Sequence, residues 1–134
     1  MHRSLPPTPA SSATQSILVE AMRRWRKARD AGRPVQPSLA RGMVRMRSAI
    51  LAPTLDSLLK FYELALGRRI AIGKTRDLSD DETLLLQLVA DTRRPSPSLG
   101  GGEAAGSRLD QALRSARIML GLAMADEALA ASPA

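Results

Sequence analysis

The chain has 134 residues, no cysteine and one histidine, His2, so disulfide scaffolds, thiolate metal sites and catalysis by a cysteine or histidine inside the fold are excluded. Apolar residues make up 44% of the chain and aromatic residues only 2%, which favours a helical core over a β-sheet. The net charge of +7 hides an asymmetry. Residues 1–76 hold 15 Lys and Arg against four acids, whereas residues 77–134 hold five Arg against nine acids. The basic half would attract polyanions or acidic proteins, and the acidic half either folds back onto it or faces another partner.

The predicted elements begin after a tail. Residues 1–13 are rich in Ser, Thr and Pro and are expected to be disordered. A first helix is predicted from about residue 14 to 31, where apolar residues recur at helical spacing: Leu18, Ala21, Met22, Trp25 and Ala28. Gly32 and Pro34 end it. Because Trp25 lies in register with this stripe, we expect it in the core rather than stacked on a nucleic-acid base.

A second helix is expected to begin near Pro37 and Ser38. Its apolar stripe comprises Leu39, Met43, Met46 and Ile50. Pro53 then either opens a third helix at its first position or kinks the second, so the two segments form separate helices or one bent rod. The stripe continues to Gly67 through Leu55, Leu58, Leu59, Tyr62 and Leu66.

A short connector and a capping box follow. Residues 68–74 are too few for more than an extended segment or an isolated strand. Ser79 and Glu82 form a capping box for a helix that stops before Pro95, with Arg93 and Arg94 in its last turn. The acids Asp77, Asp80, Asp81 and Glu82 are candidate ligands for Mg²⁺ or Ca²⁺, but they lack the spacing of a calcium loop, and we attribute them to helix capping.

The C-terminal part is expected to consist of a linker and a long helix. Residues 95–106 are rich in Pro, Ser and Gly and predict a flexible linker, and Ser107 would cap a final helix within residues 107–134. This helix would pack on the helical core of residues 14–94 or on a partner. The predicted fold is therefore all-α, an irregular bundle of four to five helices.

Basic residues lie opposite the apolar stripes of the first two helices. Arg23, Arg24, Lys27, Arg41 and Arg45 are the candidate phosphate contacts. The alternative is a solvated face without a ligand, since most charge runs are of that kind. The spacing of the helices gives little support to a helix-turn-helix, and the first helix is too sparing in large apolar residues to favour membrane binding.

These observations predict a small, non-enzymatic, bacterial protein that associates with nucleic acid, DNA in particular, in a regulatory role. An acidic protein surface is the other candidate partner. The alternative function is a helical adaptor that self-associates through residues 107–134. No cofactor or metal is expected. Without an apolar run long enough for a signal or a membrane span, a cytoplasmic location is expected.

Overall fold

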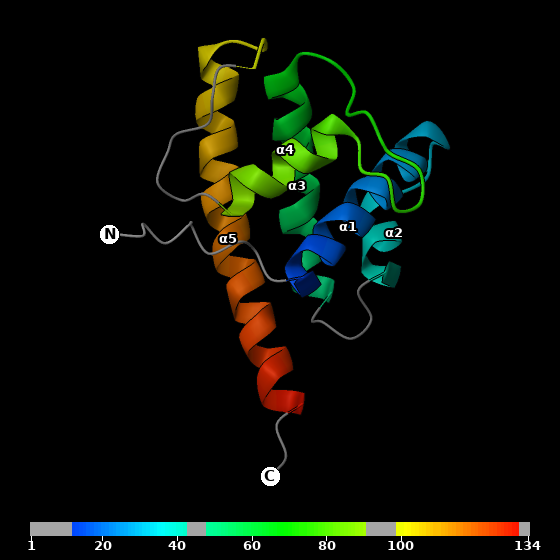
Figure 1. The fold of residues 1–134 in the computed structure, drawn as a ribbon, viewed down its shortest axis with the longest axis vertical. Coiled ribbons are helices and arrows are strands. Elements are labelled where there is room, and N and C mark those ends of the chain that lie inside the picture. Colours follow the sequence, from blue (N-terminus) through cyan, green and yellow to red (C-terminus); the bar gives the residue numbers. More distant parts are fainter. Residues whose placement is uncertain (1–11, 43–47, 91–98, 132–134) are drawn as a thin grey trace, which may run out of the picture.

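The computed structural model describes residues 12–42, 48–90 and 99–131. Within these ranges the chain forms five α-helices and no strand, which confirms the predicted all-α bundle (Figure 1). The helices are α1 (Ser12–Asp30), α2 (Val35–Gly42), α3 (Ser48–Leu66), α4 (Asp80–Ala90) and α5 (Glu103–Ala131). Of the predicted disordered tail, the last two residues belong to α1, and residues 1–11 lie outside the described residues.

The end of α1 follows from its glycine. Gly32 adopts a φ of 67°, the left-handed conformation that glycine tolerates best. The Gly32 amide donates to the carbonyl of Arg29 at 3.2 Å, and the Arg33 amide donates to that of Ala28 at 2.8 Å. These two bonds form a Schellman motif, so the chain turns sharply and Arg33 lies next to the last turn of α1.

Two prolines fall inside helices. Pro37 is the third residue of α2, where its missing N–H costs no hydrogen bond, so α2 begins two residues before the predicted start. Pro53 is the sixth residue of α3, and the helix continues through it instead of starting there. Because α2 packs against both α1 and α3, α2 and α3 are separate elements and not one bent rod. Met43 and Met46 of the predicted stripe lie outside the described residues.

The core forms around α3, which packs against α5 on one side and α2 on another (Figure 1). All five residues of the predicted α1 stripe are buried, and Trp25 is fully buried, as expected of a core residue. Its indole Nε1 donates to Asp56 Oδ1 at 2.9 Å, so the polar end of the ring is satisfied inside the fold. The α5 stripe of Leu109, Leu113, Ala116, Leu120 and Ala123 is buried as well.

The glycine segment before α5 packs against the end of α3. The Gly101 amide donates to the carbonyl of Ala65 at 2.8 Å. α5 begins at Glu103, four residues before the predicted cap Ser107, so residues 103–106 are helical and not linker. Residues 91–98, which include half of the rest of that linker as well as Arg93 and Arg94, lie outside the described residues.

Candidate functional site

Acids of the C-terminal half fold back onto the basic half, one of the two arrangements that the charge pattern allowed. Glu82 is fully buried, and Arg23 of α1 donates to its Oε2 from Nε at 2.9 Å. The amides of Gly73 and Ser79 each donate to Glu82 Oε1 at 2.9 Å. The Glu82 amide in turn donates to Ser79 Oγ at 3.0 Å. The predicted capping box is thus confirmed, and its carboxylate also binds an arginine 59 residues away.

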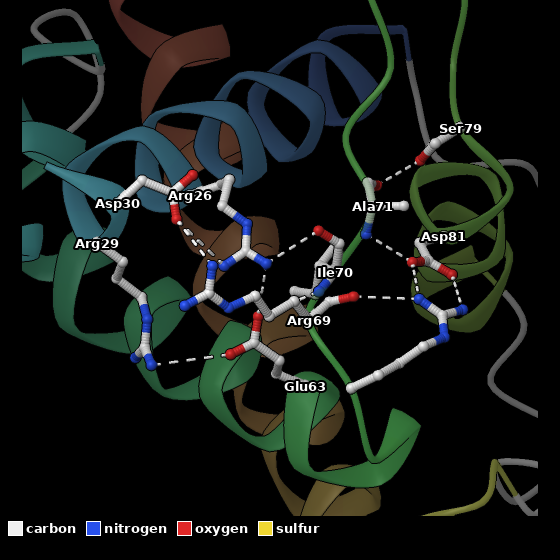
Figure 2. A network of polar contacts seen from close by, with 10 residues as sticks. Arg26, Arg29, Asp30, Glu63, Arg69, Ile70, Ala71, Ser79 and Asp81 are labelled. Atoms are coloured by element: carbon white, nitrogen blue, oxygen red, sulfur yellow. Dashed lines mark hydrogen bonds and ion pairs between the residues drawn. The ribbon is translucent and has the colours of Figure 1, made fainter.

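Asp81 also binds the connector of residues 68–74. Arg68 binds Asp81 in a bidentate manner, with N–O distances of 2.6 and 2.7 Å. The Ala71 amide also donates to Asp81, and the Ala71 carbonyl accepts from Ser79 (Figure 2). Capping alone therefore does not account for the acidic cluster, because two of its members hold the connector to α1 and α4. Among the described residues, no group of acids or histidines is arranged to hold a metal ion.

A third network surrounds Glu63 near the end of α3 (Figure 2). Its carboxylate lies 3.3 Å from Arg26 and 3.8 Å from Arg29, and it accepts from the Ile70 amide at 3.1 Å. Arg29 also lies over the Trp25 ring, 4.5 Å from its centroid. Three arginines of α1, Arg23, Arg26 and Arg29, are therefore paired with carboxylates within the fold.

These contacts predict a loss of stability in acid. Hydrogen bonds from Arg68 lower the pKa of Asp81 below its ordinary 3.8. Burial alone would raise the pKa of Glu82, but hydrogen bonds from Arg23, Ser79 and Gly73 outweigh it and lower that pKa below 4.5. Both carboxylates bind protons more weakly in the folded state, so their stabilisation is fully present above these ordinary values and is lost as the pH falls below them, through the lower pKa values of the folded state. Urea unfolding measured between neutral pH and about pH 3 should show this decline, and an unchanged free energy of unfolding would contradict it.

On another flank of α1, basic side chains surround a cavity of about 210 Å³, which we name the basic hollow. Its cations come from α1, from the α1–α2 turn and from α2: Arg24, Lys27, Arg33 and Arg41. Ala28, Ala31 and Ser38 complete the lining. The small alanines leave the space open, and the Schellman motif after α1 brings Arg33 to its rim.

The five residues predicted to contact phosphate do not all lie together in the structure. The fold brings Arg24, Lys27 and Arg41 together at the basic hollow. Arg23 lies elsewhere, bound to Glu82, and Arg45 lies outside the described residues. Arg33 also lines the basic hollow but was not among the predicted contacts. Its position directly after the helix-ending Gly32 was the signal that could have added it.

The basic hollow has no carboxylate in its lining. Lys27, Arg33 and Arg41 form no ion pair with any residue that the structure describes, unlike the arginines of the connector networks. Arg24 pairs with Glu20 at 3.0 Å, but both side chains are largely exposed. Such a surface pair contributes at most about 1 kcal/mol, so Arg24 can exchange this partner for another anion. The arrangement is suited to holding an anionic group between two helices.

Comparison with protein-family models, with curated proteins and with solved structures gives no match to this chain. Among the described residues, no helix combines the length and apolarity needed to cross a membrane.

Proposed function

We propose that this protein binds nucleic acid, DNA in particular, through backbone phosphates held at the basic hollow. The observation that supports this is the convergence of Arg24, Lys27, Arg33 and Arg41 on one cavity that no carboxylate lines. Arg24 has only the exposed Glu20 as a counter-charge, and like charges brought together in this way repel each other, so a polyanion relieves that repulsion. Guanidinium groups bind phosphate in a bidentate manner, and three of the four cations are arginines.

The expected mode is contact with the backbone and not with base edges. Each cation that neutralises a phosphate of duplex DNA releases bound counterions, which makes the affinity fall with salt. Four such cations predict a slope of log K against log salt of up to about −3.6. Affinity should then be similar for unrelated sequences of equal length. A regulatory, non-enzymatic role in a bacterial cytoplasm is part of this proposal.

Arg41→Glu tests the proposal by fluorescence anisotropy with a labelled DNA duplex at low salt. We expect affinity to weaken about tenfold, because the lost contact and the new repulsion each cost up to about 1 kcal/mol. The salt slope should also become shallower by about 1. Lys27→Glu should behave in the same way.

Arg114→Glu provides the matched control, since it changes the net charge equally at an exposed position on α5, away from the basic hollow. It should leave affinity nearly unchanged. If both variants weaken binding equally, the effect reports net charge and not this site. If the parent protein binds no DNA at low salt, the proposed function is wrong.

A further inference from the structure

A second cavity lies between the last turn of α1 and the end of α3, and we name it the α3-end cavity. Its volume is about 550 Å³, which is in the range of cavities that hold small molecules. It shares no lining residue with the basic hollow. Its lining comes from α1, from α3 and from the chain that follows α3: Arg29, Lys60, Glu63, Leu64, Gly67, Arg68 and Arg69.

Three cations of this cavity are held only loosely by carboxylates. Arg29, Lys60 and Arg69 each lie 3.6–3.8 Å from the nearest carboxylate oxygen. These distances exceed the roughly 2.7–3.2 Å of an N–H···O hydrogen bond, and none of the three side chains donates a hydrogen bond to a residue that the structure describes. The side chains are 42%, 55% and 82% exposed, so water screens these ion pairs and another anion can replace the carboxylates.

The two other charged residues of the lining, Glu63 and Arg68, are already bound to partners. Arg26 lies 3.3 Å from the Glu63 carboxylate, and the Ile70 amide donates to the same carboxylate (Figure 2). Asp81 accepts two hydrogen bonds from Arg68. The cavity therefore presents three cations for which its own lining supplies no further acid.

The end of α3 does not cancel this positive charge. The C-terminus of a helix is partly negative because its last carbonyl groups lack partners. Here the Gly67 amide donates to the carbonyls of Glu63 and Leu64 at 3.0 and 3.2 Å. The Gly101 amide donates to the carbonyl of Ala65 at 2.8 Å. Because these carbonyls accept hydrogen bonds, they repel an anion in the cavity less than free carbonyls would.

We infer that the α3-end cavity binds a small organic phosphate monoester, with its phosphate held between Arg29, Lys60 and Arg69 and its apolar part against Leu64. A phosphate monoester carries roughly 1.5–2 negative charges at neutral pH, which suits three neighbouring cations. Guanidinium groups bind phosphate in a bidentate manner. Leu64 is 56% exposed within this lining, so an apolar group that covers it adds to the affinity.

This ligand differs from the one proposed for the basic hollow. The phosphodiesters of nucleic acid carry one negative charge each. The cations of the α3-end cavity instead surround a single space that also contains an exposed leucine. Both features favour a doubly charged group joined to an apolar one.

Isothermal titration calorimetry with hexyl phosphate tests the inference, with inorganic phosphate and hexanoate at equal ionic strength as comparisons. Hexyl phosphate should bind at least about tenfold more tightly than inorganic phosphate, because its chain covers Leu64. It should bind at least about fivefold more tightly than hexanoate, because its head group carries the greater charge. If hexyl phosphate does not bind, or binds no more tightly than either comparison, the inference is wrong.

Four variants test the place of binding. Lys60→Gln and Arg69→Gln should each weaken the binding of hexyl phosphate about fivefold. Leu64→Ser should weaken the binding of hexyl phosphate but leave that of inorganic phosphate unchanged. Arg41→Gln in the basic hollow is the matched control, because it removes the same charge, and it should leave binding unchanged.

All four replaced side chains are exposed, so the variants should keep the far-UV circular dichroism of the parent. If Arg41→Gln weakens binding as much as Lys60→Gln does, the phosphate binds through net charge or at the basic hollow, which overturns the inference. None of these measurements involves nucleic acid, so their failure is distinct from failure of the proposed function.

Discussion

Replacing Glu82 by alanine is expected to destabilise the fold by about 2–4 kcal/mol, because the loss of this carboxylate leaves its hydrogen-bond donors without an acceptor. Glu82 is fully buried and accepts hydrogen bonds from Arg23, Gly73 and Ser79. Its removal leaves the half-buried amides of Gly73 and Ser79 without an acceptor and leaves Arg23 without its carboxylate partner. The connector between α3 and α4 should loosen as a result.

Urea unfolding measures this loss directly. Trp25 is the only tryptophan and is fully buried, so its emission reports unfolding of the core. Asp80→Ala is the control: Asp80 is an acid in the same first turn of α4, and its loss should cost no more than the roughly 0.3–1 kcal/mol of a helix-dipole interaction. If Glu82→Ala were no more harmful than Asp80→Ala, the buried network would contribute little to stability.

Gly101→Ala is expected to destabilise the protein by at least about 2 kcal/mol, because the new methyl group overlaps rigid backbone. A Cβ at Gly101 would lie 2.0 Å from the Leu64 carbonyl oxygen and 2.7 Å from that of Ala65. Neither atom can move without distorting the last turn of α3. The hydrogen bond from the Gly101 amide to Ala65 would be strained at the same time.

The same substitution at Gly106 should stabilise the protein instead of destabilising it. Gly106 lies within α5, and a Cβ there would meet no atom within 4 Å. Alanine is preferred over glycine in a helix, so Gly106→Ala should stabilise the protein by up to about 1 kcal/mol. Thermal unfolding of the two variants compares them directly. If both changed stability alike, the close packing of Gly101 on α3 would not matter.

Local patterns in the sequence were sufficient to predict the helices. The α1 stripe, the capping box at Ser79 and Glu82, and the helix-ending Gly32 all depend on residues within one or two turns of one another. The start of α5 was missed, because Gly100 to Gly102 are typical of a linker by composition. In the structure Gly101 lies against α3, 36 residues earlier at Ala65, and no local pattern encodes that contact.

Composition and periodicity were enough to predict that the chain is helical, that basic side chains lie opposite the apolar stripes, and that the two halves differ in charge. They could not predict which cations stay available to a ligand, because that depends on contacts between distant parts of the chain. Arg23 and Arg24 are adjacent on α1 and both were predicted to contact phosphate, yet Arg23 is bound to buried Glu82 while Arg24 lines the basic hollow. An arginine is available to a ligand only where the fold brings no carboxylate close to it, and the carboxylate that binds Arg23 belongs to Glu82, 59 residues away in the chain.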